Sequence, residues 1–111
     1  MVYDEALAAQ IRDLTAEEPD LTERKMFGGL AFLIRGNMAV AASGQGGIMV
    51  RVDPQESETL VEKTNAHHMV MRSRPMRGWL RVAPEHLRAR RELERWVELG
   101  VTCARSLPAK R

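Results

Sequence analysis

Three short apolar runs follow one another within residues 25–52, with only a few residues between them. Apolar side chains recur at every second position, the period of a β-strand, at Leu30, Phe32 and Ile34, at Met38, Val40 and Ala42, and at Ile48, Val50 and Val52. Gly36-Asn37 predicts a type II′ turn after the first run, because a leading glycine accepts a positive φ. Glycine-rich residues 44–47 form the next connection. Parallel strands need a crossover of about a dozen residues, so these strands are predicted to form an antiparallel meander.

An amphipathic helix is predicted before the meander. Its apolar side chains recur every three or four residues, at Tyr3, Leu7, Ile11 and Leu14. The helix is expected to end before Pro19, because proline disfavours helical geometry in the residue that precedes it. Residues 19–24 are interpreted as a connector.

The second half of the chain adds two helices and a hairpin. Asp53-Pro54-Gln55-Glu56 predicts the start of a short helix that runs to about Lys63. Residues 69–72 and 79–82 are interpreted as strands joined around Pro75 and Gly78. Pro84 is expected to open the longest helix, whose apolar stripe contains Ala89, Leu93, Trp96, Val97, Gly100, Cys103, Ala104 and Leu107. The predicted fold is therefore α+β, with a mainly antiparallel sheet of about five strands against an N-terminal helix, a short middle helix and a long C-terminal helix.

Composition limits the class of protein. A length of 111 residues with 44% hydrophobic residues suits one domain, residues 1–111. Cys103 is the single cysteine, so a reduced, cytoplasmic setting is expected, and the sequence contains no apolar stretch long enough for a membrane span. Asp4 and Glu5 precede any apolar run, which is not the pattern of a signal peptide.

The net charge of +2 hides two halves of opposite sign. Residues 1–63 hold 6 basic and 11 acidic side chains, whereas residues 64–111 hold 11 basic and 4 acidic ones. Residues 64–84 contain no acidic side chain but carry the candidate binding residues Arg72, Arg74, Arg77, Trp79 and Arg81. If residues 70–74 are extended, Arg72 and Arg74 emerge from one face, and the neighbouring strand adds Arg81 beside Trp79 on the same side. Guanidinium groups beside an aromatic ring suit a phosphate backbone and an unstacked base. Alternatively these arginines pair with the acidic half, within the chain or between protomers, and the low total charge favours this second interpretation.

Other candidate sites have simpler interpretations. Residues 44–47 precede a strand rather than the helix that a phosphate loop needs. His67 and His68 are neighbours that point to opposite faces of an extended chain, and Cys103 falls on an apolar stripe, so no metal site is expected. Without a nucleophile motif or paired carboxylates we expect no catalytic residues, no cofactor and no enzymatic activity.

The sequence at the start of the first predicted strand resembles that of a known protein family. Arg24-Lys25-Met26-Phe27-Gly28-Gly29 leads into an apolar strand, Gly36-Asn37-Met38 and a further β run, and this pattern is similar to the N-terminal domain of the TfoX/Sxy family over residues 5–105. Met26 and Phe27 would anchor the first strand against the helices, while Gly28 and Gly29 would permit a bulge or a close backbone approach.

The resemblance implies an α+β regulatory domain. Named members of the family regulate natural competence and assist transcription together with partner proteins. The full-length regulators continue into a second, helical domain, so the resemblance implies a stand-alone first domain here. We expect a non-enzymatic interaction module that acts through a protein partner or as a homo-oligomer, without a membrane. The alternative is direct binding of DNA or RNA through the arginines of the hairpin.

Overall fold

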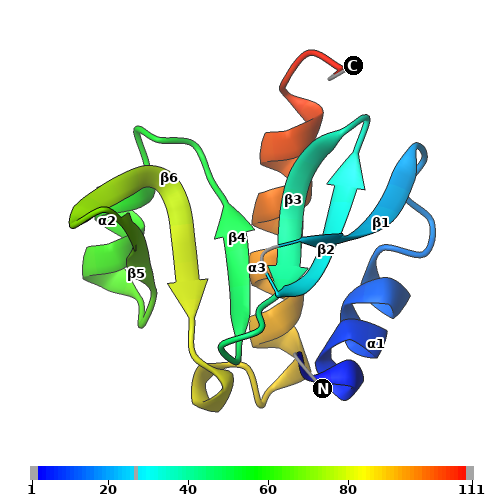
Figure 1. Ribbon diagram of the computed structural model, residues 1–111, viewed down its shortest axis with the longest axis horizontal. Coiled ribbons are helices and arrows are strands. Elements are labelled where there is room, and N and C mark those ends of the chain that lie inside the picture. The colour runs from blue at the N-terminus through cyan, green and yellow to red at the C-terminus, as the bar shows by residue number, and fades with distance from the viewer. Residues whose placement is uncertain (1–2, 27, 110–111) are drawn as a thin grey trace.

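The computed structural model describes residues 3–26 and 28–109. Three α-helices, one 3₁₀ turn and six strands are formed within these residues (Figure 1). In chain order they are α1 (Glu5–Leu14), β1 (Leu21–Met26), β2 (Gly29–Ile34), β3 (Asn37–Ala42), β4 (Ile48–Arg51), α2 (Ser57–Lys63), β5 (His67–Met71), β6 (Arg74–Val82), η1 (Pro84–His86) and α3 (Arg90–Arg105). The predicted α+β fold with an N-terminal, a short middle and a long C-terminal helix is confirmed.

The described strands form one antiparallel sheet in the order β1-β2-β3-β4-β6-β5. The sheet has one strand more than expected. The prediction that residues 19–24 form a connector is wrong, because most of this segment belongs to β1. This strand pairs with β2 from Leu21↔Ile34 to Met26↔Gly29. Its four middle residues are exposed and polar, so it lacks the apolar alternation that identified the other strands.

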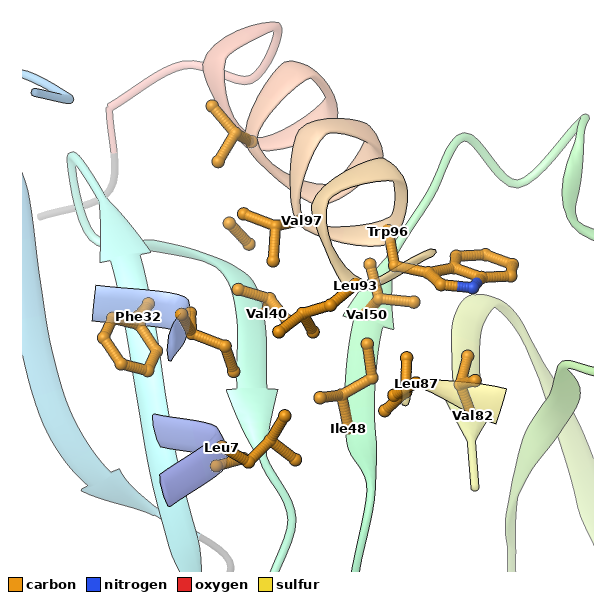
Figure 2. Packing of buried hydrophobic residues seen from close by; sticks show 14 of the residues in the cluster. Leu7, Phe32, Val40, Ile48, Val50, Val82, Leu87, Leu93, Trp96 and Val97 are labelled. Atoms are coloured by element: carbon orange, nitrogen blue, oxygen red, sulfur yellow. The ribbon is translucent and has the colours of Figure 1, made fainter. Parts of the chain in front are cut away.

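The main core lies between the sheet and two of the helices. The inward row of the strands, which includes Phe32, Val40 and Val50, packs against Leu7 of α1 and Leu93 of α3 (Figure 2). The alternation predicted for β2 and β4 is therefore confirmed. In α3, five residues of the predicted stripe are buried, namely Leu93, Trp96, Val97, Gly100 and Ala104.

The opposite face of the sheet carries a second, smaller cluster. Its buried members are Ala31, Leu33, Met38, Ala41 and Met49, with Met26, Met69 and Trp79 packed beside them. Met38 was expected in the same row as Val40, but the register shifts between Phe32 and Leu33, and this irregularity turns Met38 to the second cluster. Met26 also lies in this cluster, so its predicted packing against the helices is wrong.

The family motif is partly explained by a close backbone approach. A Cβ at Gly29 would overlap the carbonyl oxygen of Ala42 and would lie 3.1 Å from the amide nitrogen of Gly44. Gly28 has a φ of +76°, which suits the turn between β1 and β2. Phe27 lies outside the described residues. The close backbone approach that the sequence allowed for Gly28 and Gly29 is thus found at Gly29, whereas nothing lies within 4 Å of a Cβ at Gly28.

Turn positions differ from the prediction in two hairpins. The β2–β3 turn uses Arg35 and Gly36, with φ values of +52° and +84°, and Asn37 already pairs with Ile34 in the sheet. Two positive φ values are typical of a type I′ turn, so the predicted type II′ turn at Gly36-Asn37 is one residue out of place. The β5–β6 turn lies at Arg72-Ser73, whereas Pro75 and Gly78 lie within β6.

Two helix starts were also predicted too early. The carbonyl oxygen of Asp53 accepts a bond from the Glu56 amide, and its carboxylate accepts one from Gln55, so this segment forms a turn before α2 begins at Ser57. Pro84 opens the 3₁₀ turn η1, and α3 begins only at Arg90. Proline suits the first position of a 3₁₀ turn as well as that of an α-helix, so Pro84 alone did not indicate which of the two begins there.

Candidate interaction surface

The candidate arginines lie on the hairpin formed by β5 and β6. Pairing between β4 and β6 ends at Arg51↔Trp79, whereas β5 and β6 remain paired as far as Met71↔Arg74. Residues 69–78 thus form an arm, the hairpin arm, that extends beyond the end of β4 (Figure 1). The arm is paired with strands only within itself. Its base is anchored, because Met69 packs beside the second cluster and Gly78 is buried, whereas the residues at its tip are exposed.

Arg72 and Arg74 lie at the tip of the hairpin arm. Arg72 and Ser73 have φ values of +53° and +67° and form the turn, and Arg74 is the first residue of β6. Both arginines are exposed. The expectation that they emerge from one face of a single strand is wrong, because the chain reverses between them. They nevertheless lie close together at the tip, with one residue between them.

Arg77 holds the base of the arm to the loop before α2. Its guanidinium donates a hydrogen bond of 3.2 Å to the carbonyl oxygen of Pro54. Gly78, with a φ of +86°, accepts a bond of 2.9 Å from the amide of Val52, and the β5–β6 register jumps between His68↔Leu80 and Met69↔Met76. This bulge bends the arm relative to the rest of the sheet and directs Arg77 away from the tip.

Trp79 and Arg81 lie on the side of the sheet opposite the helices. The guanidinium of Arg51 stands over the Trp79 ring, 4.8 Å from its centroid, a cation–π contact. Arg81 donates a hydrogen bond of 3.0 Å to the hydroxyl of Ser43. Their predicted placement on one side is consistent with the register, in which Trp79 faces Arg51 and Arg81 faces Met49. The sequence pattern missed Arg51, because its neighbour in space is far away along the chain.

The ion pairs found among the described residues do not involve the hairpin arginines, Arg72, Arg74, Arg77 and Arg81. The pairs that form are Arg12–Glu23 at 2.6 Å, Arg35–Asp20 at 3.8 Å, Arg90–Asp13 at 2.6 Å and Arg105–Glu18 at 2.7 Å. The expectation that the hairpin arginines pair with the acidic half of the same chain is therefore wrong. Instead, the basic side chains that hold acidic residues from the other half belong to α3.

Exposed apolar side chains occur next to the arginines at the tip. Among the described residues, the large apolar side chains that are exposed are Val70, at 66%, and Met71, at 50%. Both lie in β5, immediately before Arg72. As neighbours in a strand they point to opposite faces of the arm, so each face offers an apolar side chain beside the arginines of the tip. Their exposure was not predicted, because residues 69–72 were interpreted as a strand that extends the sheet.

The rest of the surface offers weaker candidates. A groove of about 690 Å³ between α2 and α3 is lined by apolar residues such as Leu60 and Leu99 and by side chains of both charge signs. Cys103, at its wall, is partly buried, and this burial raises the pKa of its thiol. Among the described residues, no group of three metal-ligating side chains is present. The described helices also include none with the length and apolar character needed to cross a membrane.

A six-stranded antiparallel sheet covered by helices on one face, with an arginine-bearing hairpin arm, defines a small α+β domain. Comparison with models of protein families identifies the family of this domain. The chain matches the TfoX N-terminal domain over residues 13–104 and belongs to that family. The family is of a regulatory type and is not known as enzymatic. Neither the curated proteins nor the solved structures contain a match to the chain.

Proposed function

We propose that this TfoX-type domain is a non-enzymatic regulatory module that binds a partner protein in the cytoplasm through the hairpin arm. The observation that carries the proposal is the tip of the arm. Val70 and Met71 are exposed there, and Arg72 and Arg74 follow with no carboxylate partner among the described residues. Apolar side chains supply area that a partner can bury, and unpaired arginines supply specificity for its acidic groups.

Direct binding of DNA or RNA is the second candidate. It is favoured by the absence of ion pairs at Arg72, Arg74, Arg77 and Arg81 within the described chain. Three contacts favour a protein partner instead. Arg77 donates a hydrogen bond to Pro54, and Arg81 donates one to Ser43. Arg51 already occupies one face of the Trp79 ring, on which a base would stack. Among the described residues, the side chains of Arg72 and Arg74 form no hydrogen bond or ion pair, unlike those of Arg77 and Arg81.

Site-specific photo-crosslinking in the native cell tests the proposal. A photoreactive amino acid at position 70 should give a discrete crosslinked species with another protein, whereas the same group at Glu17, an exposed residue outside the hairpin, should not. Reversing two charges with Arg72→Glu and Arg74→Glu should abolish the species. The proposal fails if the crosslinks from positions 70 and 17 are the same or if charge reversal leaves them unchanged.

A titration with nucleic acid separates the two candidates. Duplex DNA and single-stranded RNA are each added to the purified chain at low and at moderate salt. Binding that weakens with salt and is lost in the Arg72→Ala, Arg74→Ala double variant would replace the protein partner by a nucleic acid. The proposal of a protein partner predicts that neither nucleic acid binds in a way that depends on these two arginines.

A further inference from the structure

The two edge strands of the sheet differ in how they are protected. β1 and β5 lie at opposite ends of the strand order, so each has one side without a described neighbouring strand. The middle of β1 carries Glu23, Arg24 and Lys25, three consecutive charged residues. Charged side chains on an edge strand discourage pairing with another chain, so β1 has the usual protection.

β5 lacks this protection. Its sequence is His-His-Met-Val-Met, without Asp, Glu, Lys, Arg or Pro. The far half of the strand belongs to the hairpin arm, and there Val70 and Met71 are exposed. Helix α2 packs near β5 through side chains such as Leu60 and Val61, which contribute to the core under the sheet. In the strand order, no described strand follows β5, so its outer edge has no strand partner among the described residues.

We infer that β5 accepts an extended, acidic segment of the partner protein as a seventh strand. The inference rests on the function proposed above and specifies how the partner binds. Main-chain hydrogen bonds along an open edge supply affinity, and alternate side chains of the added strand supply specificity. Residues 64–84 include the whole of β5 and the turn and contain no carboxylate, so within this part of the chain acidic residues of the partner segment meet only the opposite charge of the arginines, with Arg72 and Arg74 at the tip.

Methionines supply most of the apolar surface that an added strand would contact. Met69 faces Met76 across the hairpin, and Met71 faces Arg74, so these four side chains share one side of the arm. Methionine is unbranched and adapts to different apolar partners. An added strand would place every second side chain on this side, next to Met69 and Met71, and the others next to Val70. The preferred segment therefore combines apolar residues, which contact Met69, Met71 or Val70, with acidic residues that reach Arg72 and Arg74.

A second copy of this chain fits the edge less well. Antiparallel pairing of β5 with another β5 would place the two arginine tips at opposite ends of the pair, each beside a segment of the other copy that contains no carboxylate. Arg72 and Arg74 of both copies would then gain no opposite charge from the pairing. The charge pattern thus selects an acidic segment of a different protein as the occupant.

Synthetic peptides test the strand addition directly. The probe is a peptide of alternating valine and glutamate, titrated into the isotope-labelled chain and followed by the NMR shifts of backbone amides. We expect the shifts to concentrate in β5 and the turn. A peptide in which lysine replaces glutamate should bind at least about tenfold more weakly, because it meets two arginines instead of pairing with them. Methylating alternate peptide nitrogens on the edge that faces β5 should remove binding, because these groups donate the main-chain hydrogen bonds.

Two variants of the chain complete the test. Val70→Lys introduces an edge charge at an exposed position and should weaken the glutamate peptide's binding less than the double variant Arg72→Glu, Arg74→Glu does, whereas Val70→Thr, a matched β-branched control, should keep most of it. Shifts confined to the α2–α3 groove, or equal binding of the methylated peptide, would overturn strand addition. Concentration-dependent dimerisation that Val70→Lys abolishes would overturn it in favour of a second copy. Crosslinking at position 70 is a separate measurement, so strand addition can fail while the hairpin arm remains the binding surface.

Discussion

Substituting Gly100 by alanine tests how closely α3 approaches the sheet. A Cβ at this position would lie 3.0 Å from the carbonyl carbon of Ala39 and 3.1 Å from Cγ2 of Val50, and closer still to the Ala39 oxygen. Ala39 is the unpaired residue at the β2–β3 register shift, but Met38 and Val40 on either side of it are paired with β2, so its carbonyl is held in place and the helix must shift instead. Overpacking of this kind costs about 1–3 kcal/mol, and the better helix propensity of alanine returns about 1 kcal/mol. We expect Gly100→Ala to lower the free energy of unfolding by up to about 2 kcal/mol.

Urea unfolding followed by circular dichroism measures this change. A loss of about 1 kcal/mol lowers the melting temperature of a domain near this size by roughly 4–8 °C, which a thermal scan also resolves. Thr102→Ala is the matched control, because Thr102 is exposed on the same helix and its substitution should raise stability by a few tenths of a kcal/mol. If Gly100→Ala is as stable as Thr102→Ala, the close contact between α3 and β3 does not exist as described.

Three further outcomes are expected. Arg12 lowers the pKa of Glu23 by a hydrogen bond, so this carboxylate stabilises the fold above its ordinary pKa of 4.5 and loses the effect as the pH falls; Glu23→Gln should therefore be less stable at pH 7, and urea titrations of the two proteins should converge in acid. Burial raises the pKa of the Cys103 thiol, so mass spectrometry should find slower alkylation by iodoacetamide at pH 8 in the folded chain than in the urea-unfolded chain, and equal rates would contradict it. Ser73→Gly removes a side chain from a positive φ in the β5–β6 turn and should raise the free energy of unfolding by up to about 1 kcal/mol, whereas a decrease would argue against the positive φ at Ser73.

The sequence predicted those parts of the fold in which local pattern and packing agree. The alternation of Phe32, Ile34 and Val50 matches their burial, because these strands place one face on the main core. The pattern failed at Met38, where the β2–β3 register shifts, since an irregularity of this kind leaves no mark in the order of apolar residues. It failed for β1 because an exposed edge strand needs no apolar face, and charged residues there look like a connector.

The hairpin was located correctly, but its turn was not. Pro75 and Gly78 are the strongest turn signals in that segment, yet both lie in β6. Pro75 is tolerated because β4 ends opposite Trp79, so the outward side of Pro75 has no strand that would need its missing amide. Gly78 marks the bulge instead of the turn. The actual turn residues, Arg72 and Ser73, have unusual positive φ values that their types do not announce.

The candidate site was predicted in outline through its charge and missed in its details. The absence of carboxylates in residues 64–84 indicated an unusual surface, and the arginines at its tip are exposed. The partners of Arg77 and Arg81 could not be predicted, because Pro54 and Ser43 approach them only through the folding of distant segments. The exposure of Val70 depends on how far the hairpin extends beyond β4, which sequence alone does not determine.

The arginines of this chain fall into two groups with different physical roles. Arg90 and Arg105 join α3 to Asp13 and Glu18, so removing either side of these pairs changes contacts within the fold. Arg72 and Arg74 have no such partner among the described residues, so their charge can be reversed without breaking an intramolecular ion pair. A loss of binding in a tip variant that unfolds at the same urea concentration as the native chain therefore reports on the partner's contacts and not on the fold. Because the two groups are separate, binding and stability can be measured independently in the same molecule.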